Sequence, residues 1–200
     1  MSHAADIRVT IQEFWIPFDV MKWPYKPPEG ENTTKHFDAA TGPMLRKLHA
    51  PYFKIFDDYV IALNKKLGKQ VVFVVPTGQA VLALREKIIA GQVPEIKKQS
   101  DLFIDPLGHP KAVIQALSGY CQWSVIYRRT PVGLPMPAVL VSVKCSENLN
   151  RLLQSLAWDA VSHHPLNGVR DITVHQSGHS PTPGPYLLLY GQAFYKERQP

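Results

Sequence analysis

Hydrophobic and polar positions along the chain predict its first regular elements. The stretch IRVTIQEFW, residues 7–15, is β-branched and alternating, which predicts a strand. The stretch QVVFVVP, residues 70–76, is continuously apolar, which favours a strand covered on both faces, as in a parallel sheet. Between them a helix is predicted from Pro43 to Leu67, capped by Thr41 and ended by Gly68. Its apolar positions recur at spacings of three and four and comprise Leu45, Leu48, Tyr52, Ile55, Tyr59, Leu63 and Leu67.

The later part of the chain continues this pattern. Helices are predicted from Thr77 to about Ala90, from Ala112 to Tyr127 and over Leu149–Ala160, and the short apolar run Ala138–Val143 predicts a small strand. Alternating strands and helices define the α/β class. We expect one α/β domain over residues 1–165, followed by an irregular C-terminal tail over 166–200, where Ser, Pro and Gly are frequent.

Composition and charge limit the classes of function that the sequence supports. The chain is 45% hydrophobic and 19% charged, as in globular proteins. A net charge of +6 with scattered basic residues does not favour a nucleic-acid partner, and no apolar run is long enough to predict a membrane span. The start lacks a signal-peptide pattern, and the localisation stays open. The sequence contains no nucleotide-binding motif, so no cofactor is expected.

The histidines and cysteines do not predict a metal site. His175 and His179 have helical ligand spacing, but the Gly and Pro residues around them argue against a helix. The pair His163-His164 at a helix end is explained by contact with the last carbonyl groups of that helix. The two cysteines lack zinc-site spacing, and Cys121 lies in an apolar helical pattern typical of a core residue.

Candidate chemistry lies in the stretch DLFIDPLGHPKA, residues 101–112. Asp105 and His109 are separated by three residues and have the types of a general base and its orienting acid. A loop could fold the carboxylate back onto the imidazole ring. The alternative interpretation is that Asp105 caps a turn and His109 begins a helix ahead of Pro110.

The longer stretch DLFIDPLGHPKAVIQALSGYCQWSVIYRRTPVGLP resembles the C-terminal signature of SGNH-type hydrolases, the GDSL esterase and lipase group. VTIQEFW and QVVFVVP are similar to the two later strands of that family, and the resemblance covers about residues 7–135. It implies a flavodoxin-like, three-layer α/β/α fold with a parallel sheet. It also implies hydrolysis of ester bonds, with an acylated carbohydrate as one candidate substrate, His109 as the general base and Asp105 as its partner.

The sequence contains neither Gly-Asp-Ser nor Gly-x-Asn-Asp, the family blocks that supply the nucleophile and the oxyanion donors. The chain therefore resembles the C-terminal half of such a hydrolase, with an incomplete sheet. Ser100 and Ser118 are the nearest serines, and neither sits on a tight turn from strand to helix. The alternative is a non-catalytic binding or interaction module of the same fold. An open sheet edge would favour self-association in either case.

Three residues near the end of the first strand are candidate contacts for a small-molecule or carbohydrate ester substrate, namely Gln12, Glu13 and Trp15. Ligands of doubly wound sheets bind beyond the carboxyl ends of the strands, which is where these residues are expected. The alternative role for Trp15 and the aromatic residues after it is to attach a long loop to the core.

Overall fold

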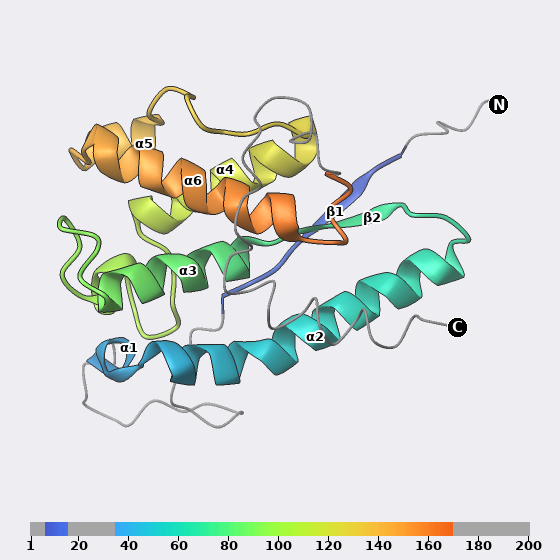
Figure 1. Ribbon diagram of the computed structural model, residues 1–200, viewed down its shortest axis with the longest axis horizontal. Coiled ribbons are helices and arrows are strands. Elements are labelled where there is room, and N and C mark those ends of the chain that lie inside the picture. Colours follow the sequence, from blue (N-terminus) through green and yellow to red (C-terminus); the bar gives the residue numbers. More distant parts are fainter. Residues whose placement is uncertain (1–6, 16–34, 170–200) are drawn as a thin grey trace, which may run out of the picture.

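The computed structural model describes residues 7–15 and 35–169, and these form a mixed α/β unit that is mostly helical (Figure 1). Two strands, β1 (Val9–Gln12) and β2 (Val72–Val75), form a parallel sheet. The helices are α1 (Lys35–Ala39), α2 (Gly42–Lys66), α3 (Thr77–Ile89), the 3-10 helix η1 (Gln99–Leu102), α4 (Ala112–Tyr127), α5 (Ala138–Ser142) and α6 (Glu147–His163). The predicted α/β class is confirmed at this level.

The sheet is paired on one side of β1 only. Val9 lies opposite Val72 and Gln12 opposite Val75, and the far edge of β2 is joined by the carbonyl of Leu166, which accepts the Val74 N–H at 3.0 Å. Among the described residues no strand pairs with the outer edge of β1. Val9 donates its N–H to the carbonyl of Val71, immediately before β2, so the N–H of Thr10 is directed to the outer edge.

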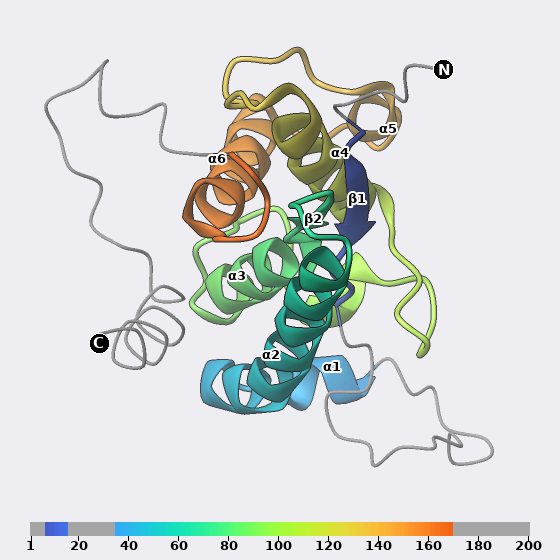
Figure 2. The same cartoon turned by 90° about the vertical axis from the view of Figure 1, so that its right-hand side faces the viewer.

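Helices cover both faces of this sheet (Figure 2). On one face, Val72 and Val74 form a hydrophobic cluster with Val60 of α2. On the other, Val75 belongs to the main core, where it joins residues such as Leu117 of α4. The main core continues between α3, α4 and α6, which is why most of the buried apolar residues lie away from the strands.

Helix α2 has nearly the predicted bounds but a different buried face. Thr41 caps it by accepting the Met44 N–H, and the helix runs on through Pro51. The predicted apolar stripe is wrong in the second half, where Ile55 and Tyr59 are 68% and 57% exposed. The buried positions instead follow four-residue spacing from Leu45 to Asp57, with a three-residue step at either end, and are Gly42, Leu45, His49, Phe53, Asp57 and Val60. Polar residues occupy two of them because their partners lie inside the protein.

The strand predicted over Ala138–Val143 is also wrong, because this run forms the short helix α5. Leu140 and Val141 both donate their N–H groups to the carbonyl of Pro137, which starts the helical turn. Leu140 is buried and its neighbour Val139 packs against the main core, so two adjacent residues face inward rather than the alternating residues of a strand.

The chain beyond the predicted boundary at 165 still packs on the domain. Asn167 and Val169 are buried, whereas the expected irregular tail over 170–200, with His175 and His179, lies outside the described residues. None of the helices in the described part is long and apolar enough to cross a membrane.

Candidate functional site

The loop between η1 and α4 brings Asp105 and His109 together. Its two sides are joined by a bridge between Phe103 and Pro110 and by the Ile104 N–H, which donates to the His109 carbonyl at 2.8 Å. Gly108 has φ +76°, a left-handed conformation that turns the chain back at low cost. As a result His109 Nδ1 lies 2.5 Å from Asp105 Oδ2. The predicted contact between the two side chains is confirmed.

The electrostatics of this pair suit an orienting carboxylate. The hydrogen bond to the His109 ring is the main cause that lowers the pKa of Asp105, and burial opposes it only in part. Asp105 Oδ1 also accepts the N–H groups of Leu107 and His109, at 3.0 and 3.3 Å. The His109 side chain is 62% exposed, and its Nε2 has no hydrogen-bond partner among the described residues. The ring is therefore held at Nδ1, while more than half of the side chain is exposed to solvent.

Trp15 attaches this loop to the rest of the protein. Its Nε1–H donates to the Gly108 carbonyl at 2.9 Å in a buried contact, and its ring stacks on Phe14 with centroids 4.5 Å apart. Only 4% of Trp15 is exposed. The contacts of Trp15 are thus with the protein itself, immediately beside His109. Its predicted contact with substrate stays a prediction.

The other polar candidates near the loop are engaged elsewhere. Gln12 Oε1 accepts hydrogen bonds from Ser118 Oγ at 3.1 Å and from Gln122 at 2.7 Å, which attaches the end of β1 to α4. Ser100 Oγ donates to Asp38 at 2.8 Å. In the part of the chain that the structure describes, no serine hydroxyl is hydrogen-bonded to His109.

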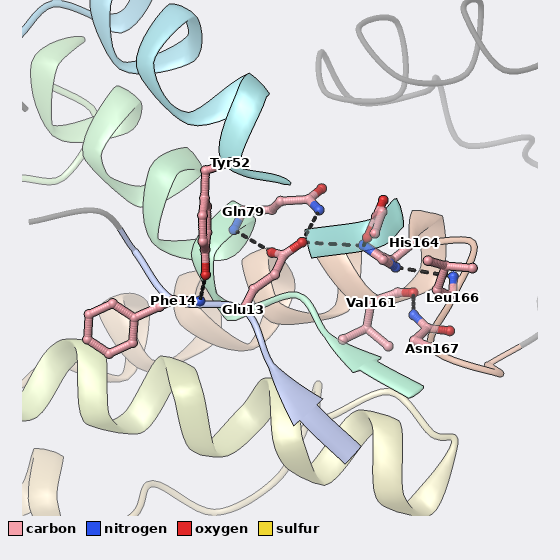
Figure 3. Close-up of polar contacts among 9 residues, drawn as sticks. Glu13, Phe14, Tyr52, Gln79, Val161, His164, Leu166 and Asn167 are labelled. Carbon is pink, nitrogen blue, oxygen red and sulfur yellow. Dashed lines mark hydrogen bonds and ion pairs between the residues drawn. The ribbon is translucent and has the colours of Figure 1, made fainter. Parts of the chain in front are cut away.

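Glu13, the third candidate substrate contact, belongs to a separate, buried cluster, and Figure 3 shows its contacts with His164 and Gln79. The cluster also contains Asp57 of α2 and His164, which directly follows α6. His164 Nε2 lies 3.4 Å from Glu13 Oε1 and 3.4 Å from Asp57 Oδ1. The cluster thus joins the end of β1, the middle of α2 and the end of α6.

Helix α3 fixes the position of Glu13. Gln79 donates its backbone N–H to Oε2 and its side-chain Nε2–H to Oε1, at 3.3 and 2.8 Å. Gly78 makes this packing possible, because a Cβ at that position would lie 2.6 Å from the Phe14 carbonyl oxygen. A side chain larger than hydrogen would push β1 away from α3.

The groups around His164 change its pKa and determine which ring nitrogen carries the proton. Burial lowers its pKa, but the hydrogen-bonding and charge interactions of Asp57 and Glu13 more than offset this and raise the pKa to about 9. On the other side of the ring, the Leu166 N–H donates to Nδ1 at 3.2 Å. When the ring is uncharged, its proton is therefore on Nε2 and faces the two carboxylates.

The sequence did not indicate Asp57 or His164 as site residues. Asp57 was hidden by the apolar spacing assigned to α2, and His164 was interpreted with His163 as part of a helix end. That interpretation is confirmed for His163, whose Nδ1 lies 2.8 Å from the Asp159 carbonyl. The one usable signal was the four-residue spacing from Leu45 through His49 and Phe53 to Asp57.

Comparisons with protein-family models, with curated proteins and with solved structures find no match for this chain.

Proposed function

We propose that this chain provides the base and its orienting carboxylate for an ester hydrolase of the SGNH type. The observation that supports the proposal best is the contact between His109 Nδ1 and Asp105 Oδ2, in a histidine side chain that is more than half exposed to solvent. A base of this kind takes a proton from a hydroxyl nucleophile, and the carboxylate holds the ring and stabilises the imidazolium that forms. An acylated carbohydrate is the substrate class that we favour.

The nucleophile in this proposal comes from outside the described residues. Ser100 and Ser118 are the serines nearest to the loop in sequence, and both hydroxyls donate to other side chains. A serine delivered to His109 Nε2, together with donors for the oxyanion, would complete the reaction centre. Each oxyanion donor contributes about 3–4 kcal/mol in comparable enzymes.

We also propose that the two-stranded sheet is part of a three-layer, flavodoxin-like arrangement. The parallel pairing of β1 and β2 and the helices on both faces, α2 on one and α4 on the other, support this. In such folds ligands bind beyond the carboxyl ends of the strands. Glu13 and Trp15 follow the carboxyl end of β1, and Trp15 contacts the loop that carries His109.

The alternative is a binding module without catalysis. The observation that favours it is the hydrogen bond from the Leu107 N–H to Asp105 Oδ1, because a carboxylate that accepts the N–H two residues later stabilises a turn on its own. In that case Asp105 shapes the loop, and His109 is an exposed residue with no proton to transfer.

Hydrolysis of p-nitrophenyl acetate by the purified chain separates the two functions. We expect His109→Ala to lower the rate by a factor of about 10²–10⁴, the usual contribution of a general base. His163→Ala is the matched control, since that histidine lies 2.8 Å from a carbonyl of its own helix and far along the chain from the loop. Equal rates for wild type and His109→Ala would refute a hydrolase whose nucleophile lies in this chain and favour the binding module.

A further inference from the structure

The enclosed cluster of Glu13, Asp57 and His164 is used by neither proposed function. Glu13 and the His164 side chain are at most 1% exposed, and one ligand atom from each of the three residues lies within 4.8 Å of the other two. We propose that these residues bind a single divalent zinc ion through Glu13 Oε1, Asp57 Oδ1 and His164 Nε2.

The spacing of the three atoms is the first support for this site. His164 Nε2 lies 3.4 Å from each carboxylate oxygen. Zinc binds nitrogen and oxygen ligands at about 2.0–2.1 Å in tetrahedral geometry, which separates neighbouring ligand atoms by roughly 3.3–3.4 Å. The same 3.4 Å is long for a hydrogen bond between nitrogen and oxygen. The two separations from His164 Nε2 therefore match those of a zinc site and are longer than direct hydrogen bonds, and the two carboxylate oxygens lie within 4.8 Å of each other.

Unpartnered atoms are the second support. Asp57 Oδ1 and His164 Nε2 are buried, and their only contacts with each other and with Glu13 are ion-pair contacts of 3.4 Å, too long to satisfy either atom as a hydrogen bond of normal length would. Buried polar atoms without a partner are rare in folded proteins, and a bound ion is one way in which such atoms are satisfied. Of the three such atoms in the described residues, Thr77 Oγ1 lies outside the cluster, and the other two are ligand atoms that the site requires.

Charge is the third support. Two carboxylates meet one imidazole in the interior, and in the described part of the chain no lysine or arginine forms an ion pair with Glu13 or Asp57. A divalent cation would neutralise both carboxylates. Gln79 already holds the Glu13 carboxylate through two hydrogen bonds, as groups around a metal ligand commonly do.

Zinc binding must rearrange the protons of His164, and this rearrangement provides an observable sign that the site is occupied. A histidine that binds metal through Nε2 carries its proton on Nδ1, whereas here Nδ1 accepts the Leu166 N–H at 3.2 Å. In the uncharged ring, zinc at Nε2 should therefore shift the single proton from Nε2 to Nδ1 and break the hydrogen bond to Leu166. The charged ring has a proton on each nitrogen, and zinc must release the Nε2 proton to solvent, so its affinity should rise with pH.

The site would stabilise the fold instead of taking part in the ester reaction. Its ligands come from β1, α2 and the residue after α6, so an ion among them would tie three segments that are distant in sequence. Burial separates the ion from substrate. Metal bound only to the folded state raises the melting temperature as its concentration rises.

The test begins with the full chain, stripped of metal by a chelator that is then removed. Titration with zinc chloride against a fluorescent competing chelator should show one ion bound per chain, with an increase in melting temperature. Asp57→Asn and His164→Gln should each lower the affinity by at least about tenfold, as even loss of a supporting group does in known sites. His163→Gln, the neighbouring histidine with partners in its own helix, should bind as wild type does.

A second measurement decides the question if the buried variants fail to fold. In the wild type, ¹⁵N NMR should show zinc shifting His164 Nε2 and the Leu166 amide together. Absence of stoichiometric zinc binding, or zinc shifts confined to other histidines, would overturn the proposal. So would an affinity that is unchanged in a folded Asp57→Asn variant.

Discussion

The hydrogen bond from Trp15 to the Asp105–His109 loop gives a prediction that follows directly from its geometry. Trp15→Phe keeps an aromatic ring against Phe14 but removes the Nε1–H that donates to the Gly108 carbonyl at 2.9 Å. The carbonyl is then left buried and without a donor, which costs about 1–3 kcal/mol of unfolding free energy. The smaller ring adds a packing loss, so we expect the total at or above the middle of that range.

Urea denaturation followed by circular dichroism measures the global loss, and hydrogen exchange measures the local one. The Ile104 amide, which donates to the His109 carbonyl across the loop, should exchange faster in the variant. Trp158→Phe is the matched control, because Trp158 packs against the main core and its indole has no hydrogen-bond partner among the described residues. A Trp15→Phe loss below about 0.5 kcal/mol, or one equal to that of Trp158→Phe, would refute the anchoring role.

Three further predictions concern the elements around the two sites. Gly78→Ala should destabilise the protein by about 1–3 kcal/mol because its Cβ would meet the Phe14 carbonyl. Gly119→Ala, in α4 where a Cβ has open space, should instead stabilise the protein by up to about 1 kcal/mol. Equal effects of the two substitutions in chemical denaturation would contradict the close packing of Gly78 against Phe14. With chelator present, the raised pKa of His164 should contribute stability that is complete below pH 6.5 and is lost as pH rises to about 9. In urea denaturation over that interval, the wild type should therefore lose more unfolding free energy than His164→Gln. Equal losses in the two proteins would exclude this contribution. If the outer edge of β1 mediates self-association, Thr10→Pro should reduce the mass found by light scattering at high concentration, and a wild-type monomer there would rule the edge out.

Periodicity in the sequence was sufficient where burial follows apolar spacing. The strand 70–76 and the helices that begin at Thr77 and Ala112 were predicted because most of their buried residues are apolar. It failed for α2, because Asp57 occupies a buried position that only a partner elsewhere in the chain can explain. It also failed for Ala138–Val143, since a short apolar run fits a strand and a helical turn equally well.

The same difference separates the contacts at the candidate site that the sequence predicted from those that it did not. Asp105 and His109 are near neighbours in sequence, so a loop was enough to predict their contact. The cluster of Glu13 with Asp57 and His164 depends on three segments that meet only in the folded chain. A single sequence carries no local pattern for such a meeting, and so the residues were assigned separately to a strand end, a helix face and a helix end.

The close pairing of the two ends of the described unit affects how the protein is made. Arg8 donates to the carbonyl of Asn167, 159 positions later, and its guanidinium also lies 3.6 Å from the centre of the Phe73 ring. Translation of that many residues takes roughly 8–30 s at ordinary rates. β2 is synthesised early enough to pair with β1, but the contact between Arg8 and Asn167 can form only after the last segment of the described unit has been made. Closure of the unit is therefore expected late in synthesis, after the sheet has paired.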